Sequence, residues 1–558
     1  MTTLDYVVIL LFTGLILLAG LSFSRQGGSD MKSFFAAGGE MPWQISGLSL
    51  FMSFFSAGTF VVWGAIAYQH GWVAVTIQWM MGLGGFAIGY FIAPAWRKTR
   101  ALTAAEFIRQ RLGTRVQRFY TYIFLLLSFF YTGAFLYPVA KLVNVSTGFS
   151  IEWSILILGI TIMLYTSVGG LWAVVVTDVL QFVILTAAVL IVVPLALDRV
   201  NGLSGLAAQV PADFMQLING EYTLGFLIAF ALYNTCFIGG NWAYVQRYTS
   251  VKDAPSARKV GYLFAGLYLI SPVLWMLPPM IYHVLNGNLS GLESEGAYLL
   301  MCQEVLPAGM LGLMLGGMIF ATASSVNTTL NLSAAVFTND IFKELRPRAS
   351  EQKLMQIARL STVAFGIVTI GVAMLVPLAG GIVEVVLTIG ALTGVPLYGP
   401  PIWALFSRRQ TGTSVLAVTL VSLGINAFFK FISPALLGIS LNRAEEMALG
   451  VAGPLILLAA YELRAYYQHR VSDQYQRYAQ QQTTRAAEVA DASASSQNRF
   501  ALKVMALSLL AVGLLVVVLG LREETGQLIT LTVGVGIWAV AAWLWHIKRK
   551  MITSTNAL

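Results

Sequence analysis

A run of hydroxyl and amide side chains interrupts an otherwise apolar stretch of the sequence at residues 321–329. Ala321, Ser324 and Ser325 are spaced i, i+3 and i+4, so a helix would place the Ala321 carbonyl and both hydroxyls on one face. A hard monovalent cation such as Na⁺ binds several neutral oxygens at close range, and carbonyls of an unwound opposite helix could complete the shell. In the alternative interpretation, the serine hydroxyls bond to carbonyls of their own helix.

One carboxylate lies inside another apolar stretch. Asp178 stands about six residues into the stretch 172–197, where a charged group is costly unless it is paired and usually marks an ion or proton site. If the membrane-spanning part begins later, Asp178 lies at the membrane interface instead. Glu384 lies near the start of the stretch 381–406, closer to the outer membrane interface, and the sequence assigns it no role.

Two further apolar stretches carry small and polar residues near their middles. Residues 53–59 read Ser-Phe-Phe-Ser-Ala-Gly-Thr, and residues 234–241 read Asn-Thr-Cys-Phe-Ile-Gly-Gly-Asn. Such residues indicate a surface that faces protein or water, because a lipid-facing helix has no use for them. The two stretches lie five spans apart, as the first helices of two five-helix repeats would, and interrupted helices at matching places indicate a transporter's midplane site. The alternative is that small residues merely allow close helix packing.

Enzyme chemistry is not expected from the remaining reactive residues. The two cysteines, Cys236 and Cys302, lie in or beside apolar stretches and offer neither a disulfide framework nor a cysteine metal cluster. The four histidines show no metal-ligand spacing. The sequence also lacks a recognisable nucleophile–base pair or phosphate-binding loop in its apolar interior. We therefore expect no organic cofactor, and no metal other than Na⁺.

These candidate residues must be positioned by membrane-spanning helices. Of the 558 residues, 57% are hydrophobic and 11% charged, with a mean hydropathy of +0.74, whereas soluble proteins carry about 25% charged residues. The composition predicts an all-α, polytopic membrane protein. A spanning helix needs about 20 mainly apolar residues, and fifteen segments meet that criterion. They are 5–22, 41–67, 72–95, 117–143, 151–169, 172–197, 223–245, 260–283, 302–338, 357–379, 381–406, 412–434, 446–466, 501–520 and 527–547.

The lysines and arginines predict the orientation of this bundle. With fifteen spans, 29 of the 34 basic residues fall in loops on one side. The positive-inside rule then places the N-terminus outside and the C-terminus in the cytoplasm. The net charge of +9 is explained by this placement and by contact with anionic membrane lipids, so a nucleic-acid partner is not expected. We expect the plasma membrane, or the inner membrane if the source is a Gram-negative bacterium.

Four stretches of the sequence form a recognisable set. The first runs from Tyr165 to Gln181 and contains Gly169-Gly170-Leu171-Trp172 and Thr177-Asp178. The others are Val245-Gln246-Arg247-Tyr248 with Lys252-Asp253, Ser324-Ser325 through Phe337-Thr338-Asn339-Asp340-Ile341, and Gly394 to Phe406 with Arg408-Arg409. In this order they resemble the sodium:solute symporter family, which includes sodium-coupled sugar, proline, pantothenate and sialic-acid carriers. The resemblance covers residues 1–435.

The resemblance implies the inverted-repeat fold of the amino-acid transporter LeuT and alternating access driven by a Na⁺ gradient. It also implies a sodium site formed by carbonyls of the broken first core helix and by a carbonyl and two hydroxyls of the eighth. The matching residues are Met52, Phe55, Ala321, Ser324 and Ser325. A second sodium site, described for the sialic-acid branch, matches Asp178, with Asn327 and Thr328 standing where that branch has serines.

The resemblance also implies where a solute would bind. The matching positions in the first, second and sixth core helices are Ser56, Thr59, Gln78 and Asn234. Sugar carriers generally place an acidic residue where this chain has Gln78, which argues against a typical hexose carrier. The carboxylate-binding arginine of the sialic-acid branch has no counterpart in the fourth span, where Tyr131 and Tyr137 occupy the corresponding region. The identity of the solute is therefore open.

The chain is expected to divide into five parts, with spans two to eleven as a ten-helix transport core. The first part is a leading helix and cytoplasmic loop at 1–40, and the second is the core at 41–406, with repeats at 41–197 and 223–406. The other three parts are two additional helices at 407–466, a flexible cytoplasmic linker at 467–500, and two C-terminal helices with a basic tail at 501–558.

The sequence as a whole predicts a Na⁺-coupled symporter that imports a small polar organic solute. A membrane sensor on the same scaffold is the main alternative, although it would normally need an attached output domain. A channel is disfavoured, because interrupted helices that face each other favour alternating access. Oligomerisation is not required by this function, and the Na⁺ stoichiometry is open.

Overall fold

The fold was analysed in a computed structural model, which describes residues 1–22, 41–55, 57–101, 103–165, 171–484, 494–522 and 526–555. Over these residues the chain is helical, with turns and loops between the helices and a single isolated bridge between Met41 and Val251. The expected all-α class is therefore confirmed.

The described part of the N-terminal half is built from helices of very different lengths. They are α1 (Thr3–Leu21), α3 (Trp43–Met52), η2 (Thr59–Trp63), α4 (Gly64–His70), α5 (Val73–Ala87), η3 (Ile88–Ile92), α6 (Ala93–Thr99), α7 (Ala104–Leu112), α8 (Thr114–Thr147), α9 (Ile151–Tyr165), α10 (Leu171–Asp198), α11 (Gly202–Gln209), η4 (Ala212–Met215), α12 (Leu224–Gly240) and α13 (Trp242–Thr249).

The C-terminal half continues in the same way. Its helices are α14 (Ala254–Trp275), α15 (Leu277–Leu285), η5 (Gly291–Gly296), α16 (Ala297–Val305), α17 (Met310–Val336), η6 (Phe337–Phe342), α18 (Lys343–Leu345), α19 (Glu351–Leu375), η7 (Pro377–Ala379), α20 (Ile382–Phe406), α21 (Gly412–Ala427), η8 (Phe428–Ile432), α22 (Ser433–Leu436), α23 (Arg443–Tyr467), α24 (Asp473–Thr484), α25 (Ala494–Gly520) and α26 (Gln527–Thr555).

Ten helices in the described part of the chain are long and apolar enough to cross a membrane, or eleven if the bent pair α12 and α13 counts as one span. Each of these coincides with an expected segment. The other four expected segments coincide with α1, α9 and α17, whose apolar windows are shorter, and with the interrupted helix α3 to α4. The chain is thus a multi-pass membrane protein, and the count of fifteen spans stays a prediction.

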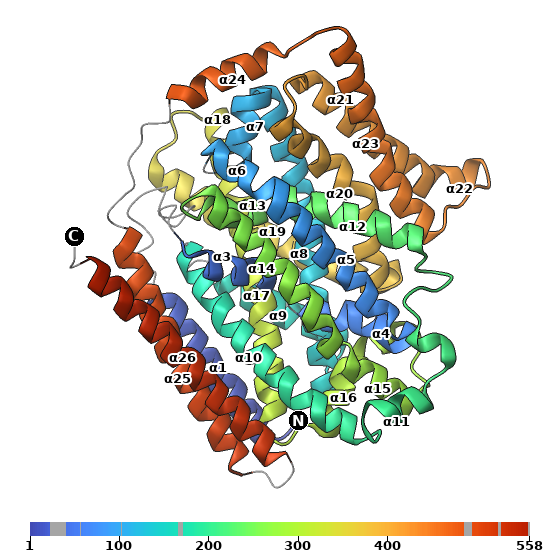
Figure 1. The fold of residues 1–558 in the computed structure, drawn as a ribbon, viewed down its shortest axis with the longest axis vertical. Coiled ribbons are helices and arrows are strands. Elements are labelled where there is room, and N and C mark those ends of the chain that lie inside the picture. The colour runs from blue at the N-terminus through green and yellow to red at the C-terminus, as the bar shows by residue number, and fades with distance from the viewer. Residues whose placement is uncertain are drawn as a thin grey trace.

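The helices form one bundle with a hairpin attached to its side (Figure 1). The hairpin consists of α25 and α26, which pack on each other and contact α1 and α10 through a core that is separate from the main one. In the figure, α7, α18 and α24 lie toward the upper end, whereas α11, α15 and α16 lie at the opposite end near the N-terminus. The upper end thus includes α7, with Arg109 and Arg111, and α18, with Lys343, which the loop charges assign to one side of the membrane.

The expected flexible linker at 467–500 is wrong for its first part, because residues 473–484 form α24. This helix lies against α7 and is held there by its own side chains. Gln474 donates to the Leu112 carbonyl at 3.1 Å and accepts from the Gly412 amide at 2.8 Å. Tyr475 stacks under the Arg111 guanidinium, 5.2 Å from the ring centre. Gln474, Tyr475 and Tyr478 therefore lie on the face of α24 that docks on the bundle.

The second and seventh expected spans are both interrupted, at the places where small and polar residues gather. Helix α3 ends at Met52, and the chain turns through residues 53–55 before helical structure resumes at residue 57. Helix α12 ends at Gly240, and α13 leaves it at an angle of 65°. Asn241 is extended at this bend, and its side-chain oxygen accepts from the Ala243 amide at 3.0 Å. The side chain thus satisfies an amide that the broken helix leaves without a partner.

A buried carboxylate holds the beginning of α20 in place. Glu295 accepts from the Ile382 amide at 2.8 Å and from the Tyr137 hydroxyl at 2.8 Å. Burial raises the pKa of this carboxyl, although its hydrogen bonds and Lys141 act in the opposite direction. Tyr137, which lies in the region where the sialic-acid branch has its carboxylate-binding arginine, donates its hydroxyl to the carboxylate that holds this helix end.

The orientation can be tested with single cysteines in a background that lacks Cys236 and Cys302. Lys252→Cys and Arg470→Cys are exposed at the end expected in the cytoplasm, and Asp213→Cys is exposed at the other end. We expect an impermeant thiol reagent to label only Asp213→Cys in intact cells, and all three after permeabilisation. The reverse labelling pattern in intact cells would overturn the predicted orientation.

Candidate functional site

The interruption after α3 is held against α17 by a threonine. Thr322 accepts a hydrogen bond from the Ala57 amide at 3.0 Å and donates to the Met318 carbonyl of its own helix, also at 3.0 Å. Across the interruption, the Thr59 hydroxyl donates to the Phe54 carbonyl. Side chains therefore satisfy backbone groups that the interrupted helix exposes, which is required where irregular backbone lies at membrane depth. No separate role was expected for Thr322 from the sequence, although it lies within the hydroxyl-rich run.

Residues of the expected first sodium site lie on both of the elements that the Ala57–Thr322 hydrogen bond joins. Met52, Phe55 and Ala321 are buried. Ser325 donates to the Ala321 carbonyl at 3.4 Å, so its hydroxyl bonds to its own helix in this state, as the alternative interpretation expected. Ser324 lies in α17, and its side chain is outside the part that the structure describes. The same holds for the side chains of Asn327 and Thr328.

Asp178 of α10 is buried and paired. It accepts from the Ser49 hydroxyl at 2.6 Å and lies 3.8 Å from the Arg247 guanidinium. The arginine also donates to the Ser49 hydroxyl at 3.2 Å, so three helices meet at this carboxylate. The sequence missed Arg247 as the partner of Asp178, although the stretch 245–248 belonged to the recognised motifs.

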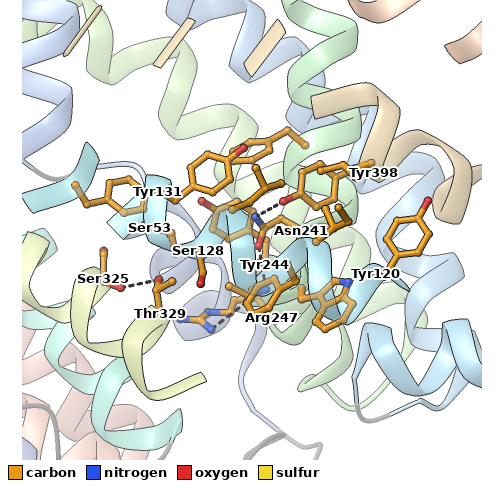
Figure 2. Close-up of a pocket in the computed structure, with 18 of the residues that line it drawn as sticks. Ser53, Tyr120, Ser128, Tyr131, Asn241, Tyr244, Arg247, Ser325, Thr329 and Tyr398 are labelled. Atoms are coloured by element: carbon orange, nitrogen blue, oxygen red, sulfur yellow. Dashed lines mark hydrogen bonds between the residues drawn. The ribbon is translucent and has the colours of Figure 1, made fainter. Parts of the chain in front are cut away.

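Asp178 lines a cavity of about 100 Å³, which we call the aspartate cavity (Figure 2). Its walls come from α8, α13, α17 and α20 and include Ser325 and Thr329, so residues of both expected sodium sites face the same space. The labelled polar and aromatic residues in Figure 2 point toward its centre from several helices. They are Ser53, Tyr120, Ser128, Tyr131, Asn241, Tyr244, Arg247, Ser325, Thr329 and Tyr398.

A second cavity of about 120 Å³ contains the expected solute-binding residues Thr59 and Asn234, and we call it the asparagine cavity. The Asn234 amide donates to the Phe230 carbonyl at 2.9 Å. Gln78 does not line this cavity; it lies one helical turn from Met81, which does. The Gln78 amide donates to the Ala74 carbonyl at 3.2 Å, and its side-chain oxygen has no hydrogen-bond partner among the described residues. Ser56 lies outside the described residues.

Aromatic side chains form much of the wall between the two cavities, and the sequence did not predict them as a set. Tyr131, Phe135, Phe237 and Tyr244 line both cavities, together with Ser53. The rings of Phe237 and Tyr244 lie 5.7 Å apart in a T-shaped arrangement. A thin layer of rings therefore separates the space beside Asp178 from the space beside Asn234. Only the position of Tyr131 in the fourth span was noted from the sequence.

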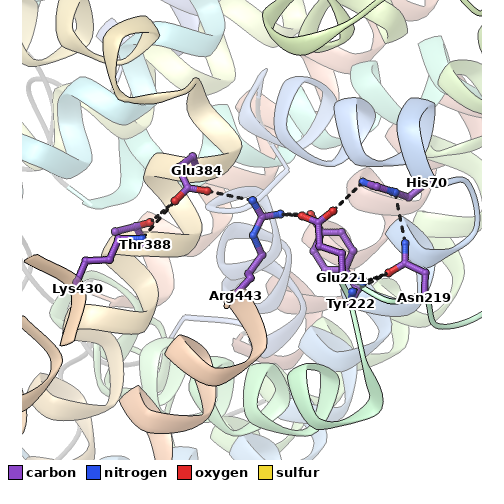
Figure 3. A network of polar contacts seen from close by, with 8 residues as sticks. All are labelled: His70, Asn219, Glu221, Tyr222, Glu384, Thr388, Lys430 and Arg443. Carbon is purple, nitrogen blue, oxygen red and sulfur yellow. Dashed lines mark hydrogen bonds and ion pairs between the residues drawn. The ribbon is translucent and has the colours of Figure 1, made fainter. Parts of the chain in front are cut away.

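A network of charged residues lies beyond Leu387 and Met447 in the lining of the asparagine cavity (Figure 3). Arg443 of α23 bonds to Glu221 and, at 3.0 Å, to Glu384 of α20. Glu384 also pairs with Lys430 at 3.4 Å, and His70 at the end of α4 lies 3.3 Å from Glu221. The sequence assigned Glu384 no role, because it could not show which residues face it.

This network borders a polar cavity of about 280 Å³, which we call the charged cavity. Leu387 and Met447 line both the charged cavity and the asparagine cavity, so the two spaces lie back to back. Isolated exposed ion pairs contribute little, about 0–1 kcal/mol each. Here the pairs connect α4, the segment before α12, α20, η8 and α23, so their joint effect is to hold these elements together.

A bundle with two interrupted helices and polar cavities at the interruptions has the architecture of a secondary transporter. The sodium:solute symporter family profile matches residues 34–421, which is most of the chain. The protein therefore belongs to the sodium:solute symporter family, as the sequence motifs predicted.

Similar proteins agree with this assignment. The chain is 27% identical to a sodium/glucose cotransporter of Vibrio parahaemolyticus over 77% of this chain and 85% of the relative. It is 26% identical to sodium/glucose cotransporter 1 of Mus musculus over 73% of this chain and 68% of that protein. Among solved structures, a substrate-bound, outward-open Na⁺-coupled sialic acid symporter superimposes with a TM-score of 0.68 at 22% identity, covering 85% of this chain and 99% of the other.

A second solved structure shows that the fold is shared more widely. Mhp1, a nucleobase-cation-symport-1 family transporter, aligns with a TM-score of 0.51 at 16% identity over 80% of this chain and 97% of its own. Membership of the symporter family makes the protein a Na⁺-coupled symporter of a small solute and a transporter rather than an enzyme. The sensor alternative is not favoured.

Proposed function

We propose that the protein imports a small polar organic solute by alternating access, with Na⁺ bound between the interruption after α3 and the middle of α17. The observation that supports this proposal is the Ala57–Thr322 hydrogen bond, which joins the interruption after α3 to α17. Na⁺ held by both elements would couple their relative position to ion occupancy. The ligands are the carbonyls of Met52, Phe55 and Ala321 and the hydroxyls of Ser324 and Ser325.

A second Na⁺ would bind at Asp178, with Asn327 and Thr328 of α17 as further ligands. Support comes from the aspartate cavity, where Asp178 and Ser325 face the same space. A carboxylate that lines a cavity within the membrane is expected to serve an ion pathway.

The solute would bind in the asparagine cavity, with Thr59 and Asn234 of its lining as polar partners. Ser56 and Gln78 stay proposed partners from the resemblance, and Gln78 would have to turn toward the cavity when the solute binds. Among the described residues that line this cavity, none is charged, while Trp63, Tyr131 and Phe237 offer aromatic faces. Amides, hydroxyls and rings can bind a polar solute without a net charge. We therefore infer a neutral or zwitterionic solute, or an acid held by backbone amides and the bound Na⁺.

The surrounding architecture follows from the same proposal. Residues 41–406 would form the ten-helix core, with repeats at 41–197 and 223–406, and α21 to α26 would be additions to it. The aspartate cavity would open to the cytoplasm and the charged cavity to the outside of a plasma or inner membrane. A single chain contains both cavities, so oligomerisation is not required.

The sodium site can be tested by removing one hydroxyl at a time. Loss of one partner from a buried polar site typically costs about 1–3 kcal/mol, so Ser325→Ala and Ser324→Ala should each weaken ²²Na⁺ binding to the purified protein by about tenfold. Ser271→Ala is a matched control, because Ser271 also bonds to its own helix, in α14, but lines neither cavity. Wild-type binding in both test variants would remove this site.

The solute site requires a substrate, which counterflow of labelled sugars, sialic acids and amino acids in proteoliposomes, with and without Na⁺, would identify. Asn234→Ala and Gln78→Ala should then raise the apparent KM by about tenfold, since each leaves a buried hydrogen-bonding group of the solute without a partner. Asn144→Ala, an amide at the end of α8, should leave KM within about twofold of the wild type. If Asn234→Ala and Gln78→Ala both keep the wild-type KM at normal expression, the solute site lies elsewhere.

The charged network should oppose opening toward the outside. Arg443→Gln removes the cation shared by Glu221 and Glu384, and two weak pairs correspond to about a threefold or larger change in an opening equilibrium. We expect faster labelling of Thr388→Cys by an impermeant thiol reagent in intact cells, in a background without Cys236 and Cys302. Arg199→Gln, which lies away from the network, is the control. Unchanged or slower labelling in Arg443→Gln would show that the network does not hold this side closed.

A further inference from the structure

Arg247 occupies the position that a bound cation would take beside Asp178. Both side chains are almost fully buried, at 4% and 6% exposure, and both line the aspartate cavity. The guanidinium lies 3.8 Å from the carboxylate oxygen that accepts from Ser49. The same oxygen therefore already has a hydroxyl donor and a positive charge.

The arginine is held in this place by several independent contacts. Its guanidinium donates to the Ser49 hydroxyl at 3.2 Å and to the Ala243 carbonyl at 3.2 Å. Its own carbonyl accepts from the Ser46 hydroxyl at 2.7 Å, which ties α13 to α3. Arg247 is therefore a built part of the cavity, with its charge directed at one carboxylate.

Two cations cannot share this carboxylate without strong repulsion, since both would be buried at short range. A buried carboxylate with no cation is also strongly unfavourable. The two requirements together mean that one cation should replace the other at Asp178.

We propose that Arg247 is a tethered cation that competes with Na⁺ for Asp178, displacing the ion toward the cytoplasm and neutralising the carboxylate after it leaves. This inference rests on the proposed second sodium site. Its structural basis is that Asp178 lies in the continuous helix α10, whereas Arg247 lies in α13, beyond the 65° bend that follows α12. Movement of α13 about this bend would carry the arginine toward or away from a carboxylate that stays in place.

The test is equilibrium binding of ²²Na⁺ alone to the purified full-length protein. Arg247→Gln removes the competitor but keeps a polar side chain, and it should bind one Na⁺ at least tenfold more tightly than the wild type. Adding Asp178→Asn should abolish this gain, because the carboxylate that gained Na⁺ is then absent. Arg258→Gln is the matched control: Arg258 is an exposed arginine that lies over Tyr90, and its loss should leave Na⁺ binding unchanged.

Arg247→Gln leaves the carboxylate without a cation in the absence of Na⁺, so Arg247→Lys carries the test if the glutamine variant does not fold. Lysine keeps the charge on a shorter and less directional side chain, and it should tighten Na⁺ binding by about threefold. Na⁺ binding no tighter than the wild type in the folded variants, or a gain that survives Asp178→Asn, would overturn the proposal. Failure of the first sodium site is distinguishable, because Ser325→Ala would then leave Na⁺ binding unchanged whatever residue stands at position 247.

Discussion

The structure depends on one constraint: backbone amides and carbonyls at membrane depth must find partners within the protein. An unbroken helix meets this requirement by itself, but the chain after Met52 and after Gly240 does not. At the first interruption Thr322 and Thr59 supply partners from side chains, and at the second Asn241 does so. The first interruption therefore depends on α17, the second is satisfied by its own side chain, and residues of both interruptions line the cavities.

The same constraint explains the close packing around the second interruption. A side chain at Gly239 or Gly240 would come within about 3 Å of atoms in Ile92, Tyr398 or Ile402, so glycine allows α12 to lie directly against its neighbours. The bend that follows turns Tyr244 and Arg247 into the space between α3, α8 and α10. The bend in this helix thereby positions Tyr244, one of the rings between the two cavities, and Arg247, the partner of Asp178.

Charge is distributed in two different ways in this protein. The basic residues of the loops are predicted to lie on one side of the membrane. Beside the cavities the charges occur in ion-paired groups: Asp178 with Arg247 beside one cavity, and Glu221, Glu384 and Glu446 with Lys430 and Arg443 beside another. The asparagine cavity between them has no charged residue among the described residues that line it. This arrangement leaves a weakly polar, aromatic space for a solute and confines strong electrostatic effects to its two sides.

The sequence alone determined the properties that depend on neighbouring residues. Hydropathy located the spans, the density of small and hydroxyl residues located both interruptions, and the motifs identified the family. The tertiary structure decided the pairings, because they join residues that helix packing brings together: Ser49 and Asp178 are 129 positions apart, and Glu221 and Arg443 are 222 apart. It also showed the aromatic wall and the docking of α24. The periodicity of the sequence specifies which face of a helix is polar, but only the packing of the helices decides which face of a neighbouring helix lies against it.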